Sequence, residues 1–267
     1  MFLSGRGPMT SRIWISAVAL AVSLGVASEV QAQGRGGRAG GGPPATGRAA
    51  AAQDLTGTWV SVVTEHWHLR MLVPPKGDFS MLPLNPEARK IAMSWDPAKD
   101  QAEGRACNAY GAATIMRVPG RYNVQWVDDN TLGMDVDSGM QRRVLHFNTT
   151  VPATQQPDIQ GYSVASWEGG TGRGRGGAGS GAHLKVVTTK MKAGYLRKNG
   201  IPYSDQATLE EHYDRFTEPN GDNWMVVTLI VTDPVYLTGP YATTNHFKKI
   251  PDKQGWDPTP CRADQAR

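Results

Sequence analysis

Residues 209–233, LEEHYDRFTEPNGDNWMVVTLIVTD, contain two runs of alternating side chains on either side of a turn at 219–222. Asn220-Gly221 within this turn is the pair that β-hairpins use, because both residue types accept a positive φ. Alternation of polar and apolar side chains predicts that each run is a strand with one face toward an apolar core. We therefore expect the two strands to pair antiparallel.

The same period of two recurs along the rest of the chain. Further runs with this pattern span residues 59–73, 122–126, 131–137, 140–147, 162–168, 183–191 and 241–250. With the hairpin they make about nine strands joined mostly by short turns, and such a chain closes into a barrel or stacks as two sheets. We predict an all-β fold, an antiparallel up-and-down β-barrel of about eight to nine strands, with a β-sandwich as the alternative.

One segment has a helical pattern instead. Asn85 stands before Pro86 and Glu87, which is typical of an N-cap followed by a proline and an acid in the first helical turn. Asp96-Pro97 then stops the pattern, because the residue before a proline disfavours the helical conformation. We predict one short helix over residues 85–95.

The N-terminus has the pattern of a secretory signal peptide. Two arginines precede an uncharged run over residues 13–27, which at about fifteen residues is shorter than the ~20 that a membrane-spanning helix needs. Val30-Gln31-Ala32 offers small side chains to a signal peptidase, so we expect cleavage near Ala32, and either Met1 or Met9 as the start. The mature chain is predicted to be soluble, periplasmic or secreted, with no membrane span.

Two glycine-rich tracts flank and interrupt the expected domain. Residues 33–53 carry almost no large apolar side chain and are predicted to form a flexible leader, since they bury too little surface to offset the ordering entropy. Residues 169–182 are predicted to be an enlarged hairpin loop within a single β-rich domain over residues 54–267. The signal contributes one net positive charge and the tracts five arginines, so the net charge of +4 becomes about −2 for the remainder. Without a rigid basic face, nucleic acid is not expected as a partner.

Cys107 and Cys261 are the two cysteines of the chain. An even pair in an exported protein favours a disulfide, and two separate thiols are the alternative. By the loop-entropy argument such a bridge would stabilise the fold by roughly 5 kcal/mol. The spacing of the two cysteines resembles no metal-binding motif.

A set of short segments resembles a family of exported bacterial proteins, some of which are described as lipocalin-like. The segments are PLNPEARKIA (83–92), WDPAKD (95–100), IMRVPGRYNVQW (115–126), GYSVASWEG (161–169), YLRKNGIPYSD (195–205), EHYDRF (211–216) and HFKK (246–249). The resemblance covers roughly residues 54–261 and implies a periplasmic, lipocalin-like β-barrel domain. It brings no activity and no catalytic residues, and the long glycine-rich loop departs from the family's pattern.

His66 and His68 are candidate metal ligands. If residues 59–73 form a strand, these two side chains point to the same side about 7 Å apart and could share an ion. A third donor would come from a neighbouring strand, from His146, His212, His246 or Glu211. The alternative is a solvent-facing pair of histidines, and a metal cofactor is not favoured.

Residues 210–215 carry every side-chain type used in acid–base chemistry. Alternation places Glu211, Tyr213 and Arg215 on one side of the strand. Glu210, His212 and Asp214 lie on the other side. Pointing into a barrel, the first three would anchor a carboxylate or carbonyl ligand. The alternative is a solvated face with cross-strand ion pairs.

Aromatic side chains recur in the predicted strands, among them Trp67 and Trp126. A barrel of this size is either filled by side chains or left open for one small ligand, and an aromatic lining suits a planar one. Residues 195–204 are predicted to be a loop that carries two cations and Tyr203. Because loops at a barrel rim often carry function, this is the loop most suited to gate a pocket.

Three functional hypotheses follow. The first is a binding module for a small apolar or aromatic molecule, with Tyr203 near the entrance and His212 and Arg215 among the anchors. The second is an enzyme on the same barrel, a hydrolase, lyase or isomerase with or without a metal ion, using the candidate histidines with Glu211 or Asp214. The third is a structural envelope protein without a ligand. The sequence does not identify a substrate, a protein partner or an oligomeric state.

Overall fold

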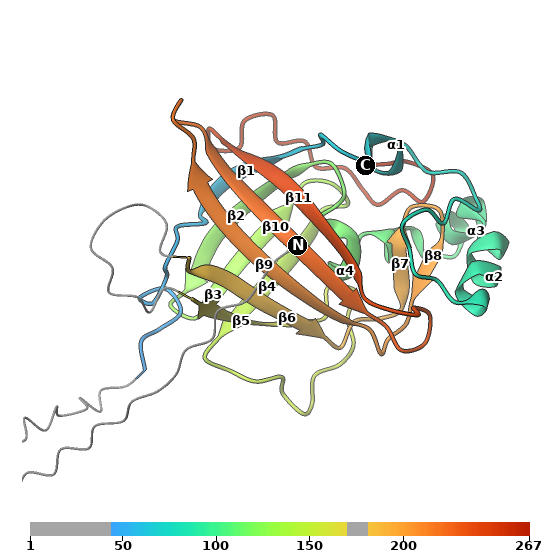
Figure 1. Cartoon of the computed structure of the whole chain (residues 1–267), viewed down its shortest axis with the longest axis horizontal. Coiled ribbons are helices and arrows are strands. Elements are labelled where there is room, and N and C mark those ends of the chain that lie inside the picture. Colours follow the sequence, from blue (N-terminus) through green and yellow to red (C-terminus); the bar gives the residue numbers. More distant parts are fainter. Residues whose placement is uncertain (1–43, 170–180) are drawn as a thin grey trace, which may run out of the picture. The chain divides into compact units, whose positions relative to one another are not determined.

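The structure, a computed structural model, describes residues 44–169 and 181–267. Nine of its strands form a closed barrel with the ring order β1-β11-β10-β9-β6-β5-β4-β3-β2 (Figure 1). The barrel strands are β1 (Gly57–Val62), β2 (Arg121–Asp128), β3 (Thr131–Val136), β4 (Gln141–Phe147), β5 (Tyr162–Glu168), β6 (His183–Thr189), β9 (Thr208–Thr217), β10 (Asn223–Thr232) and β11 (Tyr241–Ile250). The prediction of an all-β barrel is confirmed over a sandwich.

Strand pairing follows the up-and-down pattern with one exception. The hairpin of β9 and β10 pairs antiparallel as predicted, with Tyr213 opposite Val227. Strands β4 and β5 pair parallel, with Leu145 opposite Ser163, so the expectation of a wholly antiparallel barrel is wrong at this seam. The reason lies in the connection over residues 148–161, which is long enough to return the chain to the end from which β4 starts.

The core follows from the alternation of each strand. On β10, Met225, Val227, Leu229 and Val231 are buried, whereas the residues between them are half-exposed. Inward-facing side chains from all nine strands meet in this way at the barrel axis. The prominent aromatic members include Trp59, Tyr122 and Phe247, which are fully buried.

The first predicted strand is much shorter than expected. β1 ends at Val62, and residues 67–70 form a short helix, α1 (Trp67–Arg70). His66 precedes the helix with a φ of 53°, which turns the chain out of the sheet. The partner strand β2 begins at Arg121, opposite Val60, so later residues have no ladder to continue on that side. Residues 59–73 are therefore not one strand.

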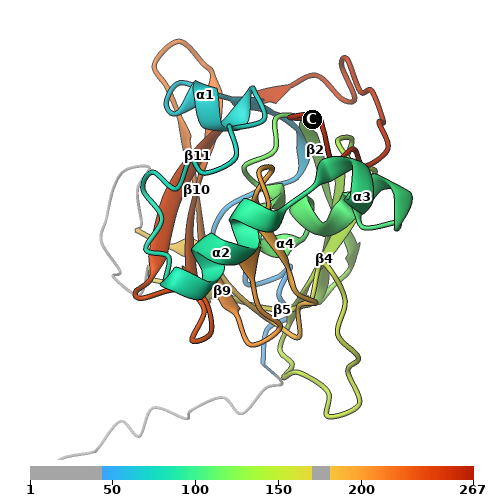
Figure 2. The same ribbon diagram turned by 90° about the vertical axis from the view of Figure 1, so that its right-hand side faces the viewer.

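One end of the barrel is covered by helices and a separate hairpin (Figure 2). These elements are α2 (Pro86–Ser94), α3 (Pro97–Ala102), η1 (Ala106–Ala109), α4 (Ala112–Ile115), β7 (Gly194–Arg197) and β8 (Ile201–Tyr203). The helix predicted over residues 85–95 is confirmed as α2, with the Asn85 side chain accepting from the Ala88 N–H. The other short helices were not predicted.

The hairpin of β7 and β8 replaces the predicted loop over residues 195–204. Its turn depends on Gly200, which has a φ of +76° and lies so close to Trp95 that a Cβ atom would come within 2.1 Å of the indole. Only glycine meets both conditions without strain. Tyr203 is 1% exposed and packs in the core, so this segment closes the barrel end as a buried hairpin.

The chain before β1 lies across the opposite end of the barrel. Gly47 donates from its N–H to the Asn130 side chain, and its carbonyl accepts from the Trp167 indole, at 2.9 Å each. Residues from Pro44 onward belong to the same compact unit as the barrel. The flexible leader was expected to reach residue 53, but its described part is held by these contacts. Residues 1–43, which hold the predicted signal and most of the predicted leader, and residues 170–180 of the predicted loop lie outside the described residues.

A disulfide joins Cys107 in η1 to Cys261, as predicted, across 154 residues of sequence. It attaches the C-terminal segment to the helical end of the barrel. Within residues 44–169 and 181–267, no helix has the length and apolar character needed to cross a membrane.

Candidate functional site

The predicted polar anchor inside the barrel is present but occupied by the chain itself. Glu211 and Tyr213 point inward from β9 and are fully buried. Arg143, from β4, forms a bidentate pair with the Glu211 carboxylate at 2.7 and 2.6 Å, and its Nη1 lies 3.3 Å from the Tyr213 hydroxyl. Thr188 accepts from the same guanidinium at 3.4 Å.

The opposite charges of Arg143 and Glu211 compensate each other. Burial by itself opposes the charged form of Arg143, but the Glu211 carboxylate outweighs it and raises the pKa of Arg143 above its ordinary value. Burial and then the same carboxylate raise the pKa of the Tyr213 hydroxyl. Arg143 was not predicted from the sequence. It lies on β4 two residues before Leu145 and four before Phe147, which are both buried, so alternation places it on the inward face.

Other candidate ligand residues do not converge on this interior. His212 faces outward and pairs with Glu210 at 2.8 Å. Arg215 is half-exposed near the far end of β9, where its guanidinium is bonded to Asn223. Trp126 packs partly buried against Phe147, while Trp67 is 59% exposed on α1. The structure thus brings together Glu211 and Tyr213 and separates the rest.

The proposed histidine pair loses its geometric basis. His66 and His68 belong to the start of α1, where residues two apart diverge around the helix. Within the part of the chain that the structure describes, no group of three His, Cys, Asp or Glu side chains is arranged to hold a metal ion. The strand-based metal prediction is therefore wrong in its premise.

A small cavity under α1 brings together four buried basic side chains. Its volume is about 20 Å³, and it is lined by Leu69, Arg70, Thr114, Arg117, Val118, Leu196, Arg197, Lys198 and Ala266. We call this the cationic pocket, because four of its nine lining side chains are basic and none is acidic. The four basic residues are 3–7% exposed.

Three segments far apart in sequence place these side chains. Arg70 ends α1, Arg117 follows α4, and Arg197 and Lys198 stand at the turn of the β7–β8 hairpin. Arg70 donates from Nε to the Arg117 carbonyl at 3.0 Å, and Arg197 donates from Nη2 to the Ser80 carbonyl at 2.7 Å. These bonds fix both guanidinium groups at the pocket wall.

The remaining donors of the pocket have no hydrogen-bond partner among the described residues. They are Nη1 and Nη2 of Arg70, Nη1 of Arg117, Nε and Nη1 of Arg197, and Nζ of Lys198. The nearest carboxylate to Arg70 belongs to Glu65, at 3.9 Å. The Lys198 ammonium lies 3.4 Å from the centre of the Tyr110 ring, a cation–π contact. Buried donors in native proteins are normally bonded to protein groups or to ordered water, so six donors without a protein partner at one cavity set this site apart.

The pKa values of the four basic groups reflect their burial without an acidic residue in the pocket lining. Burial, reinforced by the nearby charges of Arg197 and Arg70, lowers the pKa of Arg117 to about 9. Burial also lowers the pKa of Lys198 to about 7, against the weaker pull of Asp264. Burial lowers the pKa values of Arg70 and Arg197 as well. An anion in the pocket would raise each of these pKa values toward its ordinary range.

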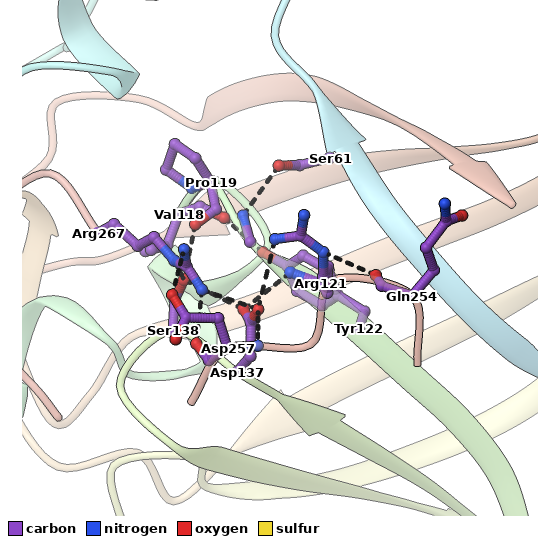
Figure 3. A network of polar contacts seen from close by, with 11 residues as sticks. Ser61, Val118, Pro119, Arg121, Tyr122, Asp137, Ser138, Gln254, Asp257 and Arg267 are labelled. Atoms are coloured by element: carbon purple, nitrogen blue, oxygen red, sulfur yellow. Dashed lines mark hydrogen bonds and ion pairs between the residues drawn. The ribbon is translucent and has the colours of Figure 1, made fainter. Parts of the chain in front are cut away.

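A second arginine cluster next to the pocket has the opposite character (Figure 3). The buried carboxylate of Asp137 accepts from the Arg121 N–H at 2.8 Å and pairs with Arg267 at 2.9 Å. Arg267 also pairs with Asp257 at 3.1 Å and donates to the Ser138 hydroxyl. This cluster, the Asp137 network, ties the C-terminal segment to the barrel with its charges matched.

The opposite end of the barrel has a larger and uncharged groove. Its volume is about 780 Å³, and it lies between residues 45–50, the ends of β4 and β5, and the side chains of Phe147 and Trp167. No charged side chain lines it among the described residues. It therefore lacks the buried unbonded cations that distinguish the cationic pocket.

The fold and the site define a closed β-barrel protein with a cluster of buried cations under its helical end and no carboxylate in the lining of that pocket. No protein-family model, no curated protein and no solved structure matches this chain.

Proposed function

We propose that the protein binds the carboxylate end of a small organic anion in the cationic pocket. The observation that carries this proposal is the set of six buried donors on Arg70, Arg117, Arg197 and Lys198 without partners. Removing a cation from water costs on the order of several kcal/mol unless an opposite charge compensates it. An anionic ligand supplies that compensation, and the protein's own carboxylates do not line the pocket.

The size of the pocket favours a carboxylate as the charged group. A cavity needs roughly 10–15 Å³ to hold one water molecule, and this one has about 20 Å³. It can therefore receive the two oxygens of a planar carboxylate more readily than the four of a phosphate. The forked donors of arginine also match a carboxylate in plane and spacing.

The lining favours binding over catalysis. Beside the cations it offers the apolar side chains of Leu69, Val118 and Leu196, and the Thr114 hydroxyl already donates to the Tyr195 carbonyl at 2.6 Å. The acid–base residues proposed from the sequence lie elsewhere: Glu211 is bonded to Arg143 in the barrel, and Asp214 is exposed on the outer face. This arrangement supports a binding module, now with an acidic ligand at the barrel end and not an apolar one at its centre.

We further propose that the protein works outside the cytoplasm, as a member of the exported family that its segments resemble. The Cys107–Cys261 bond supports an oxidising compartment, because such bonds are rare in the cytosol. The signal pattern at the N-terminus supports the same compartment.

An NMR titration of the full chain with sodium acetate tests the binding proposal. We expect saturable shifts of the Thr114, Leu196 and Arg197 amide signals at constant ionic strength. Inorganic phosphate should bind more weakly, because it fits the cavity less well. An Arg117→Gln variant should lose about 10- to 100-fold in affinity, the effect of one charged hydrogen bond.

Arg142→Gln is the matched control, since Arg142 neighbours Arg143 on β4 but is exposed and pairs with Asp135. Its affinity should equal that of the natural protein. Absence of saturable acetate binding, or equal losses in both variants, would overturn the proposal.

A further inference from the structure

An apolar groove adjoins the cationic pocket. Its volume is about 340 Å³, and it is lined by Val60, Ser61, Val63, Met71, Pro119, Gly120, Arg121 and Arg267. Three chain segments pass directly from one cavity to the other: Arg70 to Met71, Val118 to Pro119, and Ala266 to Arg267. Since bonded residues have Cα atoms 3.8 Å apart, the walls of the two cavities meet along these three segments.

The groove differs from the pocket in charge. Its two arginines are those of the Asp137 network, and Figure 3 shows their guanidinium groups directed to other protein groups. Arg267 pairs with Asp137 and Asp257, and Arg121 donates from Nε to the Gln254 carbonyl at 3.0 Å. What the groove offers to a ligand is therefore mainly the apolar surface of Val60, Val63, Met71 and Pro119.

Met71 stands at the boundary of the two cavities. Its side chain is 50% exposed, although it directly follows the buried Leu69 and Arg70 of α1. Large apolar side chains exposed beside a ligand cavity are the usual contacts for an apolar ligand group, and methionine adapts its shape to different ones. The next residue, Leu72, is 55% exposed and extends the same surface.

We propose that the natural ligand is an amphipathic carboxylate, whose charged end enters the cationic pocket and whose acyl or aryl body lies in the adjoining groove. This inference rests on the proposed function and names the ligand class for that same site. The cavity volumes support it, because about 20 Å³ admits the charged end alone and the body of any organic acid must remain outside. The groove provides 340 Å³ of mainly apolar space at that position.

Binding of a straight-chain series to the full chain tests the inference. Acetate, butanoate, hexanoate and octanoate share one carboxylate and differ in apolar length. Each added methylene should raise the affinity about two- to four-fold until the groove is filled, since a fully buried methylene contributes a factor near four and a half-open groove less. Acetate itself should bind weakly.

Two variants locate the chain in the groove. Met71→Asn should flatten the dependence of affinity on chain length. Met93→Asn is the matched control, because Met93 is similarly exposed, at 52%, on α2 and outside the groove. It should keep the full dependence on length.

The outcomes separate the two proposals. Equal affinities for acetate and octanoate, or equal flattening in both variants, would overturn the amphipathic ligand and leave anion binding in place. Failure of every member of the series to bind would overturn the proposed function itself.

Discussion

Two buried arginines, Arg143 and Arg117, show the contrast on which the proposed function depends. Arg143, inside the barrel, forms a bidentate pair with Glu211, and its pKa is raised. Arg117, under the helical end, has two other arginines for neighbours, and its pKa is lowered to about 9. At similar burial, the same side chain thus has its charge matched by a carboxylate in one place and lacks an opposite charge in the other.

This difference distinguishes a buried charge that the protein itself neutralises from one that is left for a ligand to neutralise. A buried cation that the protein neutralises itself contributes to specifying the fold, as Arg143 does. A cluster that stays unneutralised destabilises the fold, and a protein keeps such a cluster when a ligand needs it. The Asp137 network supports this distinction, because there the chain matches its arginines with two aspartates, although Arg267 directly follows Ala266 of the pocket wall.

The largest effect is expected in the barrel interior. Glu211→Gln removes the partner of Arg143 and leaves a buried uncompensated charge, which should lower the free energy of unfolding by about 3–5 kcal/mol. Thermal denaturation should show a fall in Tm of about 10 °C for a domain of this size. The double variant Arg143→Met, Glu211→Leu should regain most of this loss. A small effect of Glu211→Gln would contradict the view that this pair is structural.

Loss of the disulfide should lower the stability of the fold and the acetate affinity of the cationic pocket, but leave the barrel interior in place. Replacing Cys107 and Cys261 by alanine removes the constraint on a long loop and should cost about 2–5 kcal/mol in unfolding free energy. Because the C-terminal segment supplies Ala266 to the pocket wall, acetate affinity should also fall. The Arg143–Glu211 contact should persist, which the chemical shifts of barrel amides would report. Unchanged acetate affinity in this variant would argue against a role for the C-terminal wall.

The pocket should respond to pH where the barrel interior does not. Because the pKa of Lys198 is lowered to about 7, its neutral form prevails above pH 7 in the free protein. An anion favours the charged form, so acetate affinity should be highest below pH 7 and fall by up to tenfold per pH unit above it.

The same shift predicts the stability of the free protein. Between pH 7 and the ordinary lysine pKa the unfolded chain binds more protons, so the free energy of unfolding should rise with pH by up to about 1.4 kcal/mol per unit. Lys198→Gln should remove both dependences. Affinity that is flat in the natural protein between pH 6 and 9 would exclude Lys198 from the site.

The smallest effect on stability is expected for Arg117. Arg117→Gln relieves repulsion from Arg70 and Arg197 and loses a cation–π contact with Tyr241 at 5.6 Å. These changes oppose each other, so the unfolding free energy without ligand should change by less than about 1 kcal/mol. Chemical denaturation of Arg117→Gln and Glu211→Gln under the same conditions compares their unfolding free energies. A loss as large as that of Glu211→Gln would make Arg117 a structural residue.

Local pattern predicted most of the barrel. Alternation in residues 162–168 and 241–250 matches the bounds of β5 and β11, and it placed Glu211 and Tyr213 inward. The cap before Pro86 predicted α2 because N-terminal capping depends on residues within one turn. The pairing of Cys107 with Cys261 followed from their number and the expected compartment.

Local pattern failed where distant partners decide the structure. Alternation continues past Val62, but the neighbouring strand does not, so the chain leaves the sheet after Val62 and turns into α1 at His66. Residues 195–204 contain a proline and an Asn-Gly pair and were predicted to be a loop. They form a buried hairpin because α2, η1 and α4 cover them.

Taken alone, the amino-acid order determined a sheet of alternating strands that closes around an apolar interior, since side-chain period is a property of neighbouring residues. Only the tertiary structure decided where the charges meet. Arg70, Arg117 and Arg197 are separated by tens of residues, and no spacing between them encodes a common cavity. They come together because α1, α4 and the β7–β8 hairpin pack on the same barrel end, and unpaired charge becomes visible only after that packing removes water.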